Sequence, residues 1–456
     1  MHIHILGISG TFMSALAILA KDKGFRVTGH DAACYPPISD LLSNHGIDYI
    51  EGYDDASVML QADEVIVGNA MKRGMPIIET MLNHRKPYIS GPAWLAREVL
   101  KDYQVIAVSG THGKTSVTTM LAFILEQAGL EPGYLIGGVP QCLDSNAKCG
   151  KGTYFVIEAD EYDTAFFDKR PKFMHYRPHG LIFHNLEFDH ADIYPNLAAI
   201  QQQFHYLFRT VPQNGWVIRP AHDEGVDGAV EKGIYTPAFC WSWDNSSDAQ
   251  IEWIHADGTA FVVKTHFGEA NVQWSLMGQH NVENAVAAIL ASHKVGVPLQ
   301  QAANILKNYR PVKRRMEICF HHPDLTVYDD FAHHPTAIRR TSLAIRSSKK
   351  HQRVIGILDF ASNSMRAGHH LDKMPAALAA VDVLYALNTY DFDMQQQAMH
   401  WPCQVQVFSN VEELLQHLLA HLEPKDAILM MSNKGFARLR YQLLELLSKD
   451  FSVSQA

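Results

Sequence analysis

The sequence has little cysteine, no long apolar run and no cluster of positive charge. Its six cysteines are scattered without a CxxC pair, which favours reduced thiols in a cytoplasmic protein over a disulfide framework or a zinc site. No apolar run reaches the ~20 residues that a membrane span needs. The formal net charge is −9, with no basic block or arginine stripe. We therefore expect no membrane partner and no nucleic-acid partner.

The length and the pattern of the chain predict an α/β protein of three domains. At about 150 residues per domain, 456 residues with 47% apolar content can form three cores. Strands and helices alternate in three blocks, as they do in parallel sheets. We place the domains at 1–101, 102–310 and 311–456. The opening run HIHILGISGTFMSALAILA is expected to fold as strand, turn and helix rather than serve as an export signal.

The run from Gln104 to Thr119, QVIAVSGTHGKTSVTT, is the strongest indication of function. An apolar strand leads into a small-residue turn, and a lysine and two hydroxyls follow at a helix start. Backbone N–H groups of such a turn can surround phosphate oxygens, the lysine adds charge, and the first hydroxyl suits magnesium. The alternative is a glycine turn with a solvated lysine. The candidate phosphate-binding residues are Gly110, Thr111, His112, Gly113, Lys114, Thr115 and Ser116.

The turn GISGTF, after the first strand, indicates a second anion site at a helix start. It departs from the dinucleotide pattern G-x-G-x-x-G, because Ser9 and Phe12 replace the second and third glycines. Asp31, at the end of the second strand, could accept a hydrogen bond from a sugar hydroxyl. We favour a diphosphate-sugar site over a redox cofactor site. A plain packing turn between strand and helix remains the alternative.

Acidic residues end the two apolar runs that follow the phosphate loop. Glu158, Asp160, Glu161 and Asp163 follow one run, and Asp189 and His190 follow the next. So many neighbouring carboxylates cannot all be buried as anions, so we expect at least one to face a cation. Strand alternation would place Glu158 and Asp160 on the same side. Oxygen ligands suit magnesium, and one histidine is compatible with a second divalent ion. Solvated turns are the alternative.

Later segments carry weaker indications. The segment around Asp257 and Gly258 predicts a structural hairpin beside the main sheet. Asn281 and Asn284 share one helical face, where an amide could bind adenine, although Asn281 could equally be a helix cap.

The third block carries two further patterns. Arg314 and Arg315 could contact a transferred phosphoryl group, although exposed basic pairs are common. Three histidine doublets, at 321–322, 333–334 and 369–370, are expected mostly on the surface or in turns.

Six motifs resemble, in order and across nearly the whole chain, those of the Mur ligases of bacterial cell-wall synthesis: VSGTHGKTSVTTM, IEADEYD, NLEFDHADIY, GQHNVENA, VKRRMEI and YDDFAHHPT. The stretch EADEYDTAFFDKRPKFMHYRP, with GNAMKRGMP and SNSMRAG, resembles the murein-recycling branch. The resemblance implies a Rossmann-like first domain, a central P-loop ATPase-type domain with added β-hairpins, and a Rossmann-like third domain. For the oligomeric state, which the sequence does not settle, we favour a monomer.

The resemblance also implies a reaction. The carboxylate of UDP-N-acetylmuramate would attack the γ-phosphate of ATP to give an acyl phosphate. The amine of the tripeptide L-alanyl-γ-D-glutamyl-meso-diaminopimelate would then displace phosphate. The alternative within the family is a ligase that adds free L-alanine. Outside it, a redox module or a non-catalytic nucleotide sensor is disfavoured by the phosphate-loop residues.

By the same resemblance, each candidate residue receives a role. Lys114 would hold the β- and γ-phosphates, Thr115 and Glu158 one Mg²⁺, and His190 with Glu158 another. Asn281 and Asn284 would bind adenine, and Arg315 and Asp330 would complete the ATP site when the third domain closes. The UDP-sugar contacts would be Gly7, Ser9, Gly10, Thr11, Met13, Ser14, Asp31 and Asn69. Arg366 and Lys434 would bind the peptide carboxylates.

Three positions depart from the family pattern. Some relatives carry a carbamylated lysine where this chain has His205, so no modified lysine is expected. Asp359-Phe360-Ala361 replaces an acidic-Pro-Arg sequence, and Lys434 replaces a glycine. The last two changes fall in the presumed peptide-binding domain, so the peptide contacts are less defined than the ATP contacts.

Overall fold

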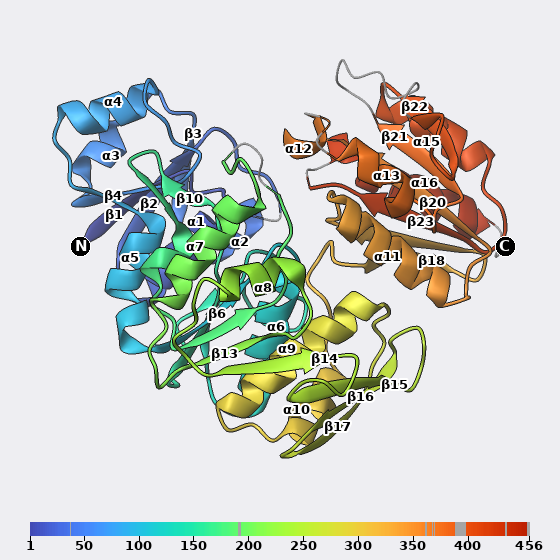
Figure 1. Cartoon of the computed structure of the whole chain (residues 1–456). Coiled ribbons are helices and arrows are strands. Elements are labelled where there is room, and N and C mark those ends of the chain that lie inside the picture. The colour runs from blue at the N-terminus through green and yellow to red at the C-terminus, as the bar shows by residue number, and fades with distance from the viewer. Residues whose placement is uncertain are drawn as a thin grey trace.

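The structure is a computed structural model that describes residues 1–36, 38–189, 193–360, 363–366, 368, 370–387, 398–433 and 436–453. The described residues form three large sheets that follow one another along the chain. We call the parts built on them the first, central and third domains. Figure 1 places the first domain at the upper left, the third at the right, and the central domain below and between them. Among the described residues, no helix has the length and apolarity to cross a bilayer.

The first domain is a parallel five-stranded sheet with the strand order β3-β2-β1-β4-β5. Every residue of its middle strand is buried, as the apolar opening run predicts. The strands are β1 (His2–Leu6), β2 (Arg26–Asp31), β3 (Asp48–Glu51), β4 (Glu64–Val67) and β5 (Tyr88–Ser90). The helices are α1 (Thr11–Asp22), α2 (Ile38–Asn44), α3 (Ser57–Gln61), α4 (Pro76–Asn83), α5 (Gly91–Glu98) and the 3-10 turn η1 (Leu100–Asp102).

The central domain contains a ten-stranded sheet with the order β17-β16-β15-β14-β13-β12-β6-β9-β7-β8. Its strands are β6 (Gln104–Ser109), β7 (Gly133–Leu135), β8 (Ala147–Lys148), β9 (Tyr154–Glu158), β12 (Gly180–Phe183), β13 (Trp216–Pro220), β14 (Ala238–Ser242), β15 (Ala249–Trp253), β16 (Ala260–Thr265) and β17 (Gly268–Gln273). Its helices are α6 (Lys114–Gln127), α7 (Leu197–Phe208), α8 (Glu224–Val230), α9 (Gln279–Lys294) and α10 (Leu299–Leu306). A separate two-stranded ribbon, β10 (Asp163–Ala165) and β11 (Asp168–Pro171), precedes the 3-10 turn η2 (Lys172–His175).

The predicted hairpin is present, but its position differs from the expectation. It does not lie beside the main sheet: β15 pairs with β14 in parallel, and β16 and β17 then continue the same sheet in antiparallel pairs. The sequence pattern identifies a hairpin because alternation is local. It carries no information about which strand edge the hairpin joins.

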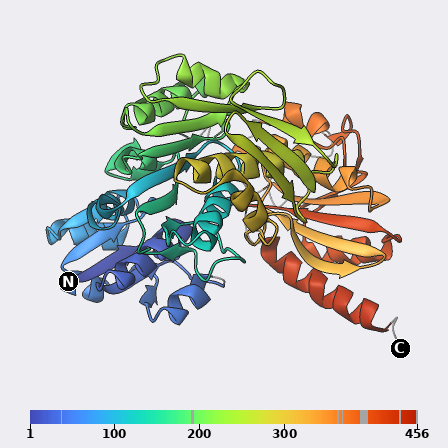
Figure 2. The ribbon, with the colours of Figure 1, turned by 90° about the horizontal axis from the view of Figure 1, so that it is seen from below.

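The third domain is a six-stranded sheet with the order β18-β19-β23-β20-β21-β22, in which only the β18–β19 pair is antiparallel among the described strands. The strands are β18 (Glu317–His322), β19 (Leu325–Asp330), β20 (Arg353–Asp359), β21 (Val383–Leu387), β22 (Gln404–Phe408) and β23 (Asp426–Met431). The helical segments are α11 (Pro335–Ser347), α12 (Asn363–Arg366), η3 (Leu371–Lys373), α13 (Met374–Ala377), α15 (Val411–Ala420), η4 (Phe436–Arg438) and α16 (Leu439–Val453). In Figure 2, α16 extends away from the first domain.

The first and central domains share one hydrophobic core. Helix α1 is buried from Met13 to Ala20 and contacts both β7 and β8 of the central sheet. Its apolar residues belong to the same buried cluster as Val105 and Phe155 of the central strands. The third domain has separate cores on the two faces of its sheet. The three-domain α/β class predicted from the sequence is confirmed, with the first two domains packed as one continuous body.

Candidate active site

The phosphate loop lies between the end of β6 and the start of α6. Gly110 and Gly113 have φ angles of 135° and 81°, which side-chain-bearing residues rarely adopt. A Cβ at Gly110 would lie 2.7 Å from the carbonyl oxygen of Asn185, and a Cβ at Gly113 would lie 2.5 Å from Asn284 Oδ1. Both positions therefore require glycine. The loop is compact against its neighbours, and its backbone can approach a phosphate chain closely.

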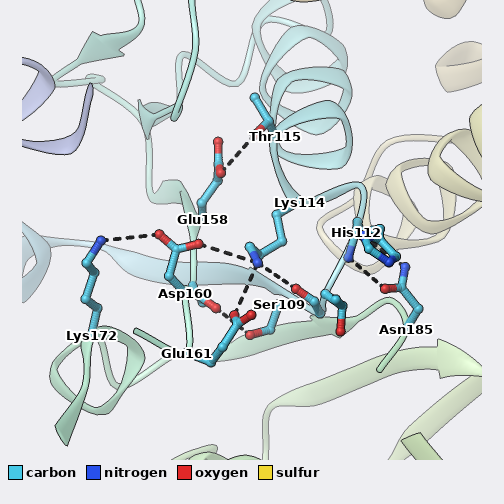
Figure 3. A network of polar contacts seen from close by, with 12 residues as sticks. Ser109, His112, Lys114, Thr115, Glu158, Asp160, Glu161, Lys172 and Asn185 are labelled. Atoms are coloured by element: carbon cyan, nitrogen blue, oxygen red, sulfur yellow. Dashed lines mark hydrogen bonds and ion pairs between the residues drawn. The ribbon is translucent and has the colours of Figure 1, made fainter. Parts of the chain in front are cut away.

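Asn185 holds the loop from the neighbouring strand. The backbone N–H of His112 donates to Asn185 Oδ1 at 2.8 Å, and Asn185 Nδ2 donates back to the carbonyl of His112 at 3.0 Å. The N–H of Thr111 donates to the Asn185 carbonyl at 3.1 Å. Figure 3 shows Asn185 reaching the loop from beneath. The sequence analysis did not select Asn185, although its position just after an apolar strand run could have identified it.

Lys114 is surrounded by carboxylates. Its Nζ donates to the carbonyl of Gly110 at 2.7 Å and to Glu161 Oε2 at 3.2 Å, and lies 3.6 Å from Asp160 Oδ1. Burial alone lowers the pKa of Lys114, but the carboxylates of Glu161 and Asp160 outweigh it and raise the pKa above its ordinary value. Lys114 is therefore a fixed positive charge beside the loop (Figure 3).

The two residues predicted to share a magnesium ion contact each other. The hydroxyl of Thr115 donates to Glu158 Oε2 at 3.0 Å, and the backbone N–H of Gly137 donates to Glu158 Oε1. Burial and the neighbouring charge of Asp160 raise the pKa of Glu158 to about 6. A buried carboxylate with a raised pKa is stabilised by a nearby cation. The oxygen donors of Thr115 and Glu158 therefore fit Mg²⁺.

The other acids of this run lie in two different places. Strand alternation was expected to place Glu158 and Asp160 on the same side. Strand β9 ends at Glu158, so Asp160 lies beyond the strand, but both side chains line the same cavity. Glu161 is buried against Lys114. Asp163 lies on the ribbon β10–β11, where it pairs with Lys169 away from the cavity. The expectation that some of these acids face a cation is met by lysines within the chain.

His190 was predicted for the metal site and Lys434 for the peptide site. Both lie outside the described residues. Asp189, which precedes His190, is buried and lines the cavity. Arg366 is exposed on α12. His205 is buried in α7, with its Nδ1 3.2 Å from the carbonyl oxygen of Gly233.

Arg315 crosses from the third domain to the phosphate loop. Its Nη2 donates to the hydroxyl of Thr115 at 3.4 Å, and its guanidinium lies 4.8 Å from the ring centroid of Phe331. Buried Asp330 accepts the backbone N–H groups of Met316 and Ala332, each at 2.8 Å. Burial raises the pKa of Asp330. Asp330 thus fixes the residues that directly follow Arg315 and Phe331, and so positions the guanidinium and the ring against which it lies.

The two asparagines of α9 are buried and differ in their contacts. Asn281 Nδ2 donates to the carbonyl of Met277 at 2.8 Å. Helix α9 begins at Gln279 and its N-cap is Gly278, so the interpretation of Asn281 as a helix cap was wrong. Asn284 lies against the phosphate loop, since its Oδ1 is the atom that excludes a Cβ at Gly113. Both residues line the cavity, so adenine contacts by either remain a prediction.

The first-domain turn is held by residues at the end of β2. Gly7 has a φ of 81°, and the N–H of Ser9 donates to Asp31 Oδ2 at 2.8 Å. Asp31 Oδ1 accepts the N–H of Ala32 at 2.7 Å. Asp31 therefore shapes this turn, which leaves its predicted sugar contact a prediction.

The remaining residues assigned to the UDP-sugar differ in exposure. Thr11 and Phe12 line the cavity that contains the phosphate loop. Gly10 precedes α1, and the Ser14 hydroxyl donates to the carbonyl of Thr11. Met13 is buried, whereas Asn69 is exposed after β4.

A second set of contacts joins the central and third domains, and the sequence analysis missed it. Thr336 donates through its hydroxyl to Glu187 Oε2 at 2.6 Å, and the rings of His112 and His334 lie 4.9 Å apart beside it. Burial raises the pKa of Glu187, but His112 and the Thr336 hydroxyl outweigh it and hold the pKa below its ordinary value. Arg340 of α11 donates to Glu283 of α9 at 3.1 Å.

Two histidines of the doublets are buried, although they lie outside regular helices and strands. His334 is at the bend before α11 and His370 is in a turn, and their ring centroids lie 4.6 Å apart. These two histidines lie where the third domain packs close to the central one. A doublet in the sequence gives no information about such packing between distant segments.

All three domains line one cavity of about 550 Å³. Thr11 and Phe12 come from the first domain, the phosphate loop and its acids from the central domain, and Arg315, Asp330 and His334 from the third. The volume falls within the range of small-molecule sites in proteins, ~300–1,000 Å³. The fold and the site therefore define a three-domain α/β protein with a phosphate loop at the junction of its domains.

Comparison with known proteins identifies the family. Residues 2–103 match the Mur ligase family catalytic domain, residues 108–292 the Mur ligase middle domain, and residues 314–434 the Mur ligase glutamate ligase domain. The chain belongs to the Mur ligase family. The assignment made from the six motifs is confirmed, and a redox function for the first domain is set aside.

Several relatives match along the whole chain. The chain is 43% identical over 455 residues to the UDP-N-acetylmuramate–L-alanyl-γ-D-glutamyl-meso-2,6-diaminoheptandioate ligase of Haemophilus influenzae, covering 98% of this chain and 99% of that one. The enzyme of the same name from Escherichia coli is 43% identical over 470 residues, covering all of both chains. A UDP-N-acetylmuramate–L-alanine ligase from Desulforapulum autotrophicum is 29% identical over 462 residues, covering 98% of this chain and 99% of that one.

Solved structures agree in fold. The crystal structure of a murein peptide ligase from Psychrobacter arcticus 273-4 matches with a TM-score of 0.78 and 42% identity, covering 98% of both chains. The UDP-N-acetylmuramate–alanine ligase of Thermotoga maritima matches with a TM-score of 0.81 at 22% identity, covering 99% of this chain and all of that one. At that identity the second match supports the shared fold alone.

Proposed function

We propose that this chain is a cytoplasmic, ATP-dependent amide ligase of peptidoglycan recycling. It joins the carboxylate of UDP-N-acetylmuramate to the free amine of L-alanyl-γ-D-glutamyl-meso-diaminopimelate and releases ADP and phosphate. The observation that carries the proposal is 43% identity along the full length to two ligases whose names give these substrates. A full-length alanine ligase reaches 29%, which disfavours free alanine as the acceptor.

The residues around the phosphate loop support ATP and Mg²⁺ as the cofactors. The backbone of the loop from Gly110 to Gly113 would hold the phosphate chain, and Lys114 would exchange its carboxylate partners for phosphate oxygens. Thr115 and Glu158 would hold Mg²⁺, and the resemblance adds His190. Bound there, the ion neutralises charge on the phosphates during transfer. Asn281 and Asn284 remain the proposed adenine contacts.

Two cations from different domains converge where negative charge develops. Lys114 lies beside the loop on the central domain, and Arg315 reaches the Thr115 hydroxyl from the third domain at 3.4 Å. Phosphoryl transfer and the later attack by the amine both place charge on oxygen, so preorganised cations lower both barriers. Because Arg315 belongs to the third domain, its contribution depends on closure of that domain. Asp330 is a positioning residue for this closed arrangement.

The substrate contacts follow from the positions of the remaining candidates. The first-domain turn from Gly7 to Ser14, with Asp31 and Asn69, would hold the UDP-sugar at its side of the cavity. Arg366 and Lys434 of the third domain would bind the carboxylates of the peptide. A guanidinium suits this task because it can bind a carboxylate through two hydrogen bonds.

The proposal is tested by ADP release with ATP, Mg²⁺ and UDP-N-acetylmuramate. L-Alanine, the dipeptide and the diaminopimelate tripeptide are compared as amines, and the products are weighed by mass spectrometry. Lys114→Met should abolish turnover, whereas Lys101→Met, an exposed lysine of the first domain, should not. Preference for alanine would identify the alternative, an alanine ligase. No turnover with any amine would contradict the ligase proposal.

A further inference from the structure

Lys172 lines the cavity from just after the end of β11, within the stretch EADEYDTAFFDKRPKFMHYRP, in which the sequence analysis gave this lysine no role. Its side chain is 14% exposed, and its Nζ lies 3.4 Å from Asp160 Oδ2. The same Nζ lies 5.2 Å from the ring centroid of Phe12 and 5.9 Å from that of Tyr162. Among the described residues, Asp160 is the one hydrogen-bond acceptor of this ammonium. Figure 3 shows the lysine approaching Asp160 from the side opposite Lys114.

Asp160 is shared by two lysines. Its Oδ1 lies 3.6 Å from Lys114 Nζ, and its Oδ2 accepts from Lys172. Lys114 is also bound by Glu161 and by the carbonyl of Gly110. Lys172 has a single, long contact to a carboxylate that already serves another cation. An ammonium group has three donors, so this arrangement leaves Lys172 with donor capacity directed at the cavity.

The position of Lys172 lies between the two parts of the proposed reaction. Its ring neighbour Phe12 belongs to the first-domain turn proposed for the UDP-sugar, and Asp160 connects it to Lys114 of the phosphate loop. Thr11, Phe12, Lys114 and Lys172 line the same cavity. A sugar nucleotide bound at the first-domain turn, with its carboxylate at the phosphate loop, would therefore lie beside this ammonium.

We propose that Lys172 binds an anionic group of the sugar-nucleotide substrate, its carboxylate or its diphosphate, and holds it toward the phosphate loop. This inference rests on the proposed function. Contacts with Phe12 on one side and Asp160 on the other restrict the lysine to this orientation. A charged hydrogen bond of this kind is among the stronger contacts available to an anion.

The test uses three variants of the full chain. Lys172→Met keeps the aliphatic stem and removes the charge, and Lys172→Arg keeps the charge. Lys169→Met is the matched control, because Lys169 lies on β11, three residues before Lys172, and its side chain is 69% exposed. Calorimetry measures the binding of UDP-N-acetylmuramate and of UDP-N-acetylglucosamine, which lacks the carboxylate, and steady-state kinetics give the KM for ATP.

Lys172→Met should weaken UDP-N-acetylmuramate about tenfold or more, in line with loss of a contact to a charged group. The KM for ATP should stay within about threefold, and Lys172→Arg should recover part of the affinity. A loss confined to UDP-N-acetylmuramate assigns the contact to the carboxylate, and an equal loss for both nucleotides assigns it to the diphosphate.

Three results would overturn the inference. These are unchanged binding in Lys172→Met, an equal loss in Lys169→Met, or a rise in the KM for ATP alone. If the wild-type chain binds neither nucleotide, the proposed function fails together with the inference. If wild type binds and Lys172→Met binds equally well, only the inference fails. If Lys172→Met does not fold, the test rests on Lys172→Arg, which keeps the positive charge. This variant should still bind UDP-N-acetylmuramate, and complete loss of binding in it would contradict a role of the charge.

Discussion

The hydroxyl of Thr115 donates to the carboxylate of Glu158 at 3.0 Å, across 43 positions of sequence. Thr115 lies in the first turn of the helix after the phosphate loop, and Glu158 ends the adjacent strand. Parallel pairing of β6 with β9 brings them together. The contact joins the two oxygen donors that the proposed function assigns to magnesium.

Glu158→Gln should separate function from stability. The variant keeps a hydrogen-bond acceptor for Thr115 but loses the charge, so turnover should fall by about 10²–10³. Burial raises the pKa of Glu158 to about 6, so its charge destabilises the unliganded fold at neutral pH. The melting temperature of the variant should therefore equal or exceed that of wild type. Calorimetry measures the melting temperature and ADP release the turnover. Glu126→Gln is the control for turnover, because Glu126 lies on α6, pairs with Lys148 and does not line the cavity. Full activity in Glu158→Gln would refute its metal role.

Gly113→Ala should damage nucleotide binding for a steric reason. Gly113 and Gly129 have φ angles of 81° and 79°, but only at Gly113 does a Cβ meet another atom, Asn284 Oδ1 at 2.5 Å. Alanine at either position should cost about 1 kcal/mol of backbone strain. Only Gly113→Ala should also raise the KM for ATP, by tenfold or more. Equal kinetics in the two variants would show that the loop tolerates a side chain.

Thr336→Val should weaken domain closure. It removes the 2.6 Å hydrogen bond to Glu187 between the third and central domains. Hydrogen bonds to charged groups contribute ~1.5–3 kcal/mol, and partial exposure of Glu187 reduces that, so kcat/KM should fall about tenfold. Small-angle scattering of the liganded protein should show a more open shape. Thr265→Val, whose hydroxyl bonds the hairpin carbonyl of Gly268, should leave both measurements unchanged. If Thr336→Val behaves in the same way, the contact does not support closure.

His4 should make the first domain sensitive to acid. Its Nδ1 lies 2.7 Å from Thr28 Oγ1 and its Nε2 lies 2.7 Å from His30 Nδ1, and burial lowers its pKa to about 3. The unfolded chain takes up a proton below the ordinary pKa of about 6.5. The folded chain does so only near pH 3, so stability falls as the pH decreases through this range.

The size of this effect can be measured with one variant. Because folded His4 stays neutral, lowering the pH from 7.5 to 5.5 should reduce the unfolding free energy of the wild type by about 1.4 kcal/mol. His4→Gln should lose correspondingly less over the same interval in urea titrations. His84→Gln, at an exposed histidine of the same domain, serves as the control and should follow wild type. Identical pH dependence in all three proteins would contradict a neutral, buried His4.

The sequence was sufficient to predict local structure where the residues concerned are neighbours in the chain. The phosphate loop from Gly110 to Thr115 occupies six consecutive positions, and the apolar strand before it and the helix after it are both present as predicted. Such a run shows directly where the backbone needs glycine and where a hydroxyl follows at the helix start. The family motifs placed Glu158, Arg315 and Asp330 at the same cavity, although their separation in sequence gives no geometric information.

The sequence was insufficient where contacts join distant segments. Glu187 and Thr336 are 149 positions apart, and neither belongs to a pattern that predicts their pairing. The hairpin after Asp248 was recognisable, but its continuation of the main sheet depends on the edge of β14. Lys172 is one of many lysines until the fold places Phe12 and Asp160 beside it. These positions follow from tertiary packing rather than from periodicity or turn chemistry.

The amine preference of the purified chain tests the central claim most directly. ADP release is measured with ATP, Mg²⁺ and UDP-N-acetylmuramate at equal concentrations of L-alanine and of L-alanyl-γ-D-glutamyl-meso-diaminopimelate. The account predicts a kcat/KM for the tripeptide at least about 10²-fold above that for alanine, with a product mass equal to the two substrates less one water. A higher kcat/KM for alanine would contradict it.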